Sequence, residues 1–128
     1  MERRETAGIL LIKDGKILLQ HRSDDAERNP GMWSFFGGGI EGDETPLEAV
    51  KREAHEELEY TLTNPRHIDY EEGEYANTHV FVEEYDGQPL VQHEGQGMGW
   101  FTIDEALTLN ISPTRRASLE RLRDKIFQ

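Results

Sequence analysis

The apolar residues of this chain gather in short runs separated by turns rich in glycine, proline and acidic residues. Residues 6–13 (TAGILLIK) and 16–22 (KILLQHR) flank Asp14-Gly15, a dipeptide typical of tight turns, and predict a β-hairpin. Residues 23–31 are polar and end in Pro-Gly, which predicts a loop. Further strands are predicted at residues 33–36, 61–70, 78–85, 90–92 and 98–102, and the glycines at 37–39 are expected to break the first of them.

The next apolar pattern has the period of a helix. Thr45, Pro46 and Glu48 combine a capping box with proline at the first helical position. They predict a helix that runs from Pro46 to about Glu59. The residues expected to form its buried apolar stripe are Leu47, Val50, Ala54 and Leu58.

Two more helix starts lie toward the C-terminus. Thr102 and Glu105 form a second capping box, and Ser112-Pro113 begins a terminal helix with apolar residues on one face. Strands interspersed with a few helices indicate an α/β or α+β fold with a mixed sheet. The chain has no internal repeat, low-complexity tract or linker, so residues 1–128 are expected to form a single domain.

Composition and charge narrow the classes of function. The net charge of -12 argues against non-specific binding to nucleic acid, but it is compatible with small anionic substrates that metal ions bridge to the protein. With no cysteine, disulfides and thiolate metal sites are excluded. The charged start MERRETAG predicts no signal peptide, and no apolar run is long enough to span a membrane. We therefore expect a cytoplasmic protein that does not bind membranes, with the choice between monomer and homodimer left open.

The predicted helix from Pro46 concentrates carboxylates on one side. At about 100° per residue, Glu53, Glu56 and Glu57 fit a single arc beside Ala54 and Leu58. Like charges at this spacing disfavour a helix, and carboxylates held near a core have raised pKa values unless a cation compensates. Hard oxygen ligands in this arrangement predict a site for Mg²⁺, with Mn²⁺ as the alternative.

The segment from Gly38 to Tyr60, GGIEGDETPLEAVKREAHEELEY, resembles the Nudix box. The box runs Gly, five residues, Glu, seven residues, Arg-Glu-aliphatic, one residue, Glu-Glu, one residue, Gly-aliphatic. Glu59 stands where the box has glycine, and Phe36 replaces a proline common before the glycines. Glutamate adopts the left-handed conformation of that glycine only at a cost, which leaves a different helix end open. The positions that match the box are Gly38, Glu44, Arg52, Glu53, Ala54, Glu56 and Glu57.

The resemblance implies a fold and a set of metal ligands. The fold would be a Nudix-type α/β/α sandwich with a mixed β-sheet and a catalytic loop-helix. Arg52 would orient the glutamates by a charge-assisted pair, with Glu44 as a candidate partner. The metal ligands would be Glu53, Glu56, Glu57 and a carbonyl of the Gly37-Gly38 turn.

Residues outside the box supply further candidates. The segment HEGQGMGW, residues 93–100, resembles a MutT-type loop, so Glu94 is a candidate metal ligand or general base, with a plain polar loop as the alternative. Glu53 is the other candidate base. The candidate substrate-binding residues are Arg22, Arg28, Phe35, Gly37 and Phe81, although solvated surface for the arginines and core packing for the aromatic rings are the alternatives.

The implied reaction is hydrolysis of a nucleoside diphosphate linked to another group, by in-line attack of water on the pyrophosphate. The short chain with its MutT-like ending favours a nucleoside or deoxynucleoside triphosphate, cleaved to the monophosphate and pyrophosphate. The alternatives are ADP-ribose, a nucleotide sugar or a dinucleoside polyphosphate as substrate, or a non-catalytic nucleotide sensor. The stretch ISPTRR places arginines about where enzymes that remove oxidised guanine carry an amide, which counts against specificity for 8-oxoguanine.

Overall fold

The computed structural model describes residues 3–128, which form a mixed sheet covered by helices on both faces. The sheet order is β3-β2-β1-β6-β5, with β4 paired to β1 and β7 paired to β2. The strands are β1 (Arg4–Lys13), β2 (Lys16–His21), β3 (Trp33–Ser34), β4 (Phe36–Gly39), β5 (Arg66–Glu72), β6 (Ala76–Glu84) and β7 (Gly97–Phe101). The helices are α1 (Pro46–Leu58), α2 (Ile103–Ala106) and α3 (Pro113–Ile126).

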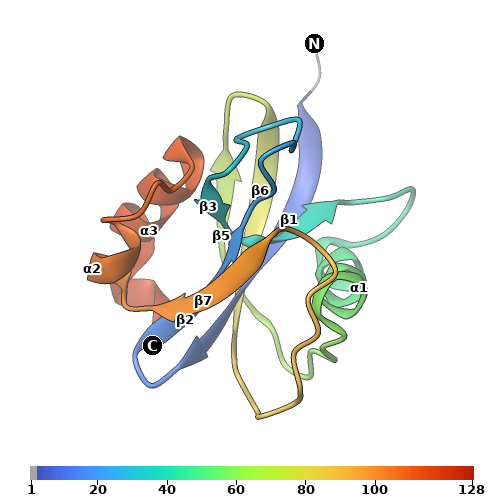
Figure 1. Cartoon of the computed structure of the whole chain (residues 1–128). Helices are drawn as coiled ribbons and strands as arrows, with labels where there is room; N and C mark the ends of the chain where they lie inside the picture. The colour runs from blue at the N-terminus through green and yellow to red at the C-terminus, as the bar shows by residue number, and fades with distance from the viewer. Residues whose placement is uncertain (1–2) are drawn as a thin grey trace.

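Helix α1 lies on one side of the sheet, and α2 and α3 lie on the other (Figure 1). Successive residues of β1 pack on opposite faces of the sheet, because side chains alternate across a strand. Ile9 and Leu11 belong to the cluster that includes Ala54 of α1, whereas Leu10 packs in the cluster that includes Leu119 of α3. The predicted α/β/α sandwich with a mixed sheet is therefore confirmed.

Strand β1 is the centre of this arrangement. It pairs in parallel with β6 along its length, from Arg4 opposite Ala76 to Ile12 opposite Glu84, and antiparallel with β2 and β4. Because both faces of β1 are covered, its apolar residues form a continuous run. No helix within residues 3–128 is long and apolar enough to cross a membrane.

The predicted hairpin and three helices are present. Asp14 and Gly15 both have positive φ, 51° and 75°, as a two-residue hairpin turn requires. Thr45 caps α1 through the predicted capping box. Glu59 takes the left-handed conformation, with φ 53° and ψ 33°, so α1 ends as it would with glycine there.

Three predictions about the strands were wrong. The glycines at 37–39 do not break a strand, because residues 36–39 form β4 and pair with β1. The strand predicted at 61–70 begins at Arg66, since the Glu83 carboxylate accepts hydrogen bonds from the N–H groups of Thr63 and Asn64 and holds them in a loop. Residues 90–92 form no strand; the Val91 N–H donates instead to the carbonyl at the end of α1.

The buried face of α1 also differs from the predicted stripe. Leu47 is exposed, whereas Ala49, Glu53 and Glu57 are buried. The carboxylates therefore lie within the packed face of the helix, not beside it. Strand β4, which α1 contacts, explains this shift, because its glycines leave space that apolar side chains elsewhere would fill.

Candidate active site

Helix α1 packs against β4 through two carboxylates. Both residues, Glu53 and Glu57, are buried, with 9% and 8% of their surface exposed. The Gly37 N–H donates to Oε1 of Glu57 at 2.7 Å. A Cβ atom at Gly38 would lie 2.6 Å from Oε1 of Glu53, closer than carbon and oxygen tolerate. The lack of a side chain at Gly38 therefore makes room for the Glu53 carboxylate between helix and strand.

Burial changes the acid strength of both groups. Burial, together with the smaller effect of the neighbouring Glu53 charge, raises the pKa of Glu57 to about 8, against the opposing effect of the Gly37 N–H. Burial also raises the pKa of Glu53, although its bond to Arg52 works in the opposite direction. Such carboxylates would carry their charge more readily beside a cation.

Arg52 joins the helix, the preceding loop and β4. Its Nε and Nη2 donate to the two carboxylate oxygens of Glu44 at 2.7 and 3.0 Å, a bidentate pair that lowers the pKa of Glu44. Its Nη1 donates to Glu53 at 2.9 Å and to Glu56 at 3.1 Å. Nη2 also donates to the Gly39 carbonyl. One guanidinium thus orients Glu53 and Glu56, which together with Glu57 form the acidic face of α1.

The donor set fits a divalent cation by its chemistry. Glu53, Glu56 and Glu57 offer oxygen ligands, and two of them are buried, which suits a hard ion such as Mg²⁺. As they stand, no three acidic or histidine side chains within residues 3–128 lie close enough together to ligate one ion. Glu53 and Glu56 instead accept hydrogen bonds from Arg52 Nη1, and Glu57 accepts one from the Gly37 N–H.

Glu94 lies on a loop that is attached to the end of α1. The N–H groups of Val91 and His93 donate to the carbonyls of Leu58 and Glu57 at 3.1 and 2.8 Å. The Glu94 side chain is exposed, and its charge contributes to the raised pKa of Glu57. The structure therefore brings Glu94 to the acidic face from a distant part of the chain.

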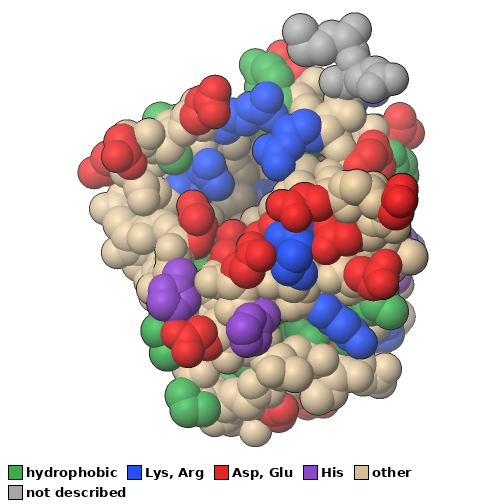
Figure 2. Space-filling model, turned by 90° about the vertical axis from the view of Figure 1, so that its right-hand side faces the viewer, with side chains coloured by type: hydrophobic (Ala, Val, Ile, Leu, Met, Phe, Trp, Pro, Cys, Tyr) green, Lys and Arg blue, Asp and Glu red, His purple; other side chains and the backbone are tan. Residues whose placement is uncertain are grey.

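A cavity of about 200 Å³ adjoins the carboxylates. Gly37 and Gly38 line it, and the same two glycines lie against Glu57 and Glu53. Figure 2 shows a hollow with Lys and Arg side chains along its upper rim and a group of acidic side chains below it. The cavity and the acidic face thus share one wall.

The cavity gathers some of the predicted residues and adds others. Among the predicted substrate-binding residues, Arg22, Arg28, Phe35 and Gly37 line it. Phe81 does not line the cavity: it is 3% exposed and packs in the core cluster on the α1 side, so it is not available to stack on a base. Phe35 is also buried, at 6% exposed, but it does line the cavity. The lining residues that the sequence analysis did not assign to the substrate include Arg4, Tyr75 and Arg115.

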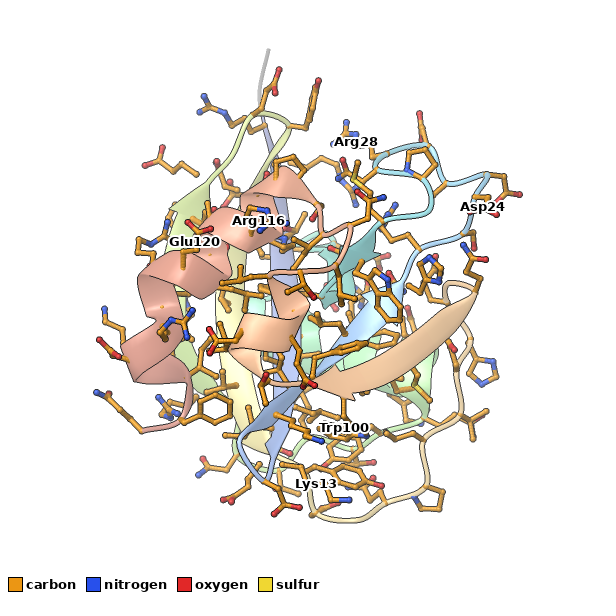
Figure 3. All side chains as sticks on the ribbon, turned by 60° about the vertical axis from the view of Figure 1, so that its left-hand side comes forward. Lys13, Asp24, Arg28, Trp100, Arg116 and Glu120 are labelled. Carbon is orange, nitrogen blue, oxygen red and sulfur yellow. The ribbon has the colours of Figure 1, made fainter. Side chains whose placement is uncertain are left out.

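Arg28 and Tyr75 meet at this cavity from separate parts of the chain. The Arg28 guanidinium carbon lies 5.0 Å from the centre of the Tyr75 ring, a cation–π distance. Nε of Arg22 donates to the Arg28 carbonyl at 2.9 Å and so holds the loop after β2. Figure 3 shows Arg28 on this loop, at the end of the molecule away from Lys13 and Trp100. No sequence signal at Tyr75 indicated this contact, because the pairing of β5 with β6 decides where the residue lies.

Comparison with known proteins gives concordant results. Residues 2–122 match the family model for the NUDIX domain. The chain is 32% identical over 128 residues to the CTP pyrophosphohydrolase of Escherichia coli (strain K12), covering 94% of this chain and 91% of that protein. It is 33% identical over 127 residues to the NAD-capped RNA hydrolase NudC of Chromobacterium violaceum, covering 92% of this chain but 47% of that protein.

A solved structure shares the fold. The MutT NUDIX hydrolase from Burkholderia pseudomallei superposes with a TM-score of 0.83 at 24% identity, covering 95% of this chain and 99% of that one. The family model spans nearly the whole chain, and the carboxylates of α1 lie on the segment with the Nudix-box spacing. This chain therefore belongs to the Nudix hydrolase family, whose members act on phosphoric anhydride bonds.

Proposed function

We propose that this protein hydrolyses a nucleoside or deoxynucleoside triphosphate to the monophosphate and pyrophosphate, with Mg²⁺ as its metal. One observation carries the proposal. The cavity is lined on one side by Gly37 and Gly38, which lie against the carboxylates of α1, and it is also lined by basic and aromatic side chains. A nucleoside triphosphate has two matching ends, an anionic chain and a flat base. The similarity to a CTP pyrophosphohydrolase over most of both chains supports the same class of substrate.

The metal-binding residues follow from the acidic face. Nudix hydrolases generally need a divalent metal ion. Glu53, Glu56, Glu57 and Glu94, with the Gly38 carbonyl, are the proposed ligands. When bound, such an ion would neutralise phosphate charge and make a water molecule more acidic.

Side chains that line the cavity would contact the substrate, and Arg52 would position the acidic residues. Arg22 and Arg28 would meet the negative charge of the phosphates from the loop after β2. Phe35 would contact the base. Arg52 would act as a positioning residue, because its bidentate pair with Glu44 holds the guanidinium that in turn holds Glu53.

Two carboxylates are candidates for the proton acceptor. Glu53 is buried and held by Arg52 in a fixed position, which suits a base that must lie within hydrogen-bond reach of the attacking water. Glu94 is exposed and lies on a loop. We favour Glu53 as the base and Glu94 as the additional ligand.

The proposal predicts Mg²⁺-dependent turnover that requires Glu57. The purified protein is incubated with Mg²⁺ and a panel of canonical and oxidised triphosphates, ADP-ribose, nucleotide sugars and dinucleoside polyphosphates. Wild type is expected to release pyrophosphate and a monophosphate from triphosphates. Glu57→Gln is expected to lower this rate by at least about 100-fold, because it replaces a buried ligand carboxylate with a neutral amide.

Glu120→Gln is the matched control, since it makes the same chemical change at an exposed position on α3 (Figure 3). It is expected to keep the wild-type rate. Cleavage of ADP-ribose, a nucleotide sugar or a dinucleoside polyphosphate in preference to triphosphates would replace the proposed substrate. Nucleotide binding without turnover of any compound would support the sensor alternative.

A further inference from the structure

Two histidines on neighbouring strands face each other outside the candidate active site. His67 lies on β5 and His79 on β6, and Nε2 of His67 is 3.0 Å from Nδ1 of His79. His79 is two residues from Phe81 of the core cluster on the α1 side, and the His67 ring packs edge-on against the same Phe81. Both histidines therefore lie on the face of the sheet that carries α1. His67 is exposed, so the pair is open to solvent.

The separation of the two nitrogen atoms suits a shared metal ion. Bonds from imidazole nitrogen to zinc are about 2.0–2.1 Å long. Two such bonds that meet at an angle of about 90–110° need nitrogen atoms about 2.8–3.4 Å apart. The observed distance of 3.0 Å lies within this range. An ion can therefore take the place of the hydrogen between the two rings with little movement of either side chain.

A carboxylate beside His79 favours the tautomer that metal binding needs. Oε1 of Glu5 is 3.9 Å from Nε2 of His79, the ring nitrogen that does not face His67. The negative charge favours a hydrogen on Nε2, which leaves the lone pair of Nδ1 free for a metal. Glu5 is itself held in place, because Oη of Tyr70 donates to its two oxygens at 2.9 and 3.1 Å. Nδ2 of Asn77 also donates to Oε2 of Glu5, at 2.8 Å.

Both imidazole rings are also fixed by packing. The centre of the His79 ring lies 4.6 Å from that of Tyr70, and the centre of the His67 ring lies 5.1 Å from that of Phe81. Side chains that are already ordered lose less conformational entropy when they bind an ion. Within residues 3–128 no third acidic or histidine side chain joins the pair, so water would complete the coordination.

We propose that His67 and His79 form a binding site for a divalent transition-metal ion of the Zn²⁺ type, separate from the Mg²⁺ site proposed on α1. Imidazole nitrogen suits Zn²⁺, Ni²⁺ and Cu²⁺, whereas Mg²⁺ takes oxygen ligands. Nε2 of His67 and Nδ1 of His79 each give a lone pair to the ion. The hydrogen on Nε2 of His67 moves to Nδ1 of the same ring, so both rings stay neutral. Because the ligands lie on two strands, the ion ties β5 to β6.

The test is calorimetric titration with Zn²⁺ in excess Mg²⁺, which occupies the oxygen ligands of the acidic face. Wild type is expected to bind Zn²⁺ at least about tenfold more tightly than His67→Gln, which replaces a ligand nitrogen with an amide. His79→Gln should lose a similar factor. If this partly buried substitution prevents folding, the exposed His67→Gln carries the test. Glu5→Gln should weaken binding less, because it removes a partner of His79 and no ligand.

His55→Gln is the matched control, because His55 is an exposed histidine of α1. It should keep the wild-type affinity for Zn²⁺, and so should Glu57→Gln, which changes the acidic face. Loss of tight Zn²⁺ binding in Glu57→Gln but not in His67→Gln would place the ion at the acidic face and overturn the proposal. Equally weak binding in wild type and both histidine variants would indicate an adventitious ion only and would also overturn it.

Two further measurements report on the ligands themselves. With one equivalent of Cu²⁺, electron paramagnetic resonance should show coupling to the nitrogen atoms of two imidazoles in wild type and of one in His67→Gln. Zn²⁺ should raise the melting temperature of wild type and not that of His67→Gln, because the ion binds the folded sheet. Identical Cu²⁺ spectra of the two proteins would exclude His67 as a ligand. None of these readouts measures hydrolysis, so the inference stands or fails independently of the proposed function.

Discussion

Two glycines and two glutamates meet at the centre of the candidate site. Gly37 supplies an N–H to Glu57, and Gly38 leaves the space that the Glu53 carboxylate occupies. Gly37 has a second constraint, because its φ is 147° and a Cβ there would lie 2.2 Å from the Ala7 carbonyl oxygen. The buried positions of the Glu53 and Glu57 carboxylates therefore depend on the absence of side chains at Gly37 and Gly38 of β4.

Gly38→Ala is expected to lower turnover on the order of 100-fold, because the added methyl group must displace the Glu53 carboxylate from its contact with Arg52. The measurement is kcat/KM for the preferred triphosphate, together with a melting temperature that shows the variant is folded. Gly97→Ala is the control, since its Cβ would meet the nearest atom at an ordinary 3.7 Å. Equal activities of the two variants would show that the Glu53 position is not critical.

At the scale of elements, the end of α1 is joined to the loop that carries Glu94. Glu59 ends the helix in a left-handed conformation, and its carboxylate lies 2.5 Å from Nε2 of His93. Hydrogen bonds from the loop backbone to the last carbonyls of α1 reinforce this junction. Glu59, which replaces the glycine of the Nudix box, therefore ends the helix in the same conformation and adds a contact with His93 of the loop.

Glu59→Gly is expected to unfold with a free energy about 1 kcal/mol higher than Glu59→Gln. Both variants lose the carboxylate that contacts His93, and glycine alone also relieves the positive φ of 53°. Unfolding in urea, monitored by circular dichroism, measures the difference. Equal stabilities would mean that glutamate holds the left-handed conformation here without strain.

At the scale of the whole molecule, the fold places carboxylates inside a chain that already carries a net charge of -12. Burial raises the pKa of Glu57 to about 8, from the 4.5 of an unperturbed glutamate. Between these pH values the folded state holds a proton that the unfolded state has released. The free energy of unfolding of the metal-free protein should therefore decrease as the pH rises through this window.

This pH dependence should be weaker in Glu57→Gln, which cannot titrate at that position. Melting temperatures measured from about pH 5 to about pH 9 with a chelator present provide the test, because this range includes the raised pKa of Glu57 (~8). Glu120→Gln removes the same charge from an exposed position and should follow the wild-type profile. Matching profiles for wild type and Glu57→Gln would show that Glu57 does not bind the proton.

Some features of the fold could be predicted from local sequence because local interactions produce them. The Asp14-Gly15 turn, the capping box of Thr45 and the helix from Pro46 each depend on residues a few positions apart. The strand at 36–39 could not be read in this way. Its glycines have weak intrinsic preference for a strand, and pairing with β1, which precedes it by about thirty residues of chain, creates it.

The helix with its three glutamates, the hairpin and the Nudix-box spacing are all predictable from the sequence, since they depend on short-range order along the chain. The burial of Glu53 and Glu57, the approach of Glu94, the core position of Phe81 and the arrival of Arg115 at the cavity become visible in the folded chain alone. The physical reason is that burial and proximity result from packing between distant segments. Parallel pairing of β1 with β6 places Thr6 beside Thr78, and through it Arg115, a contact that no local pattern contains.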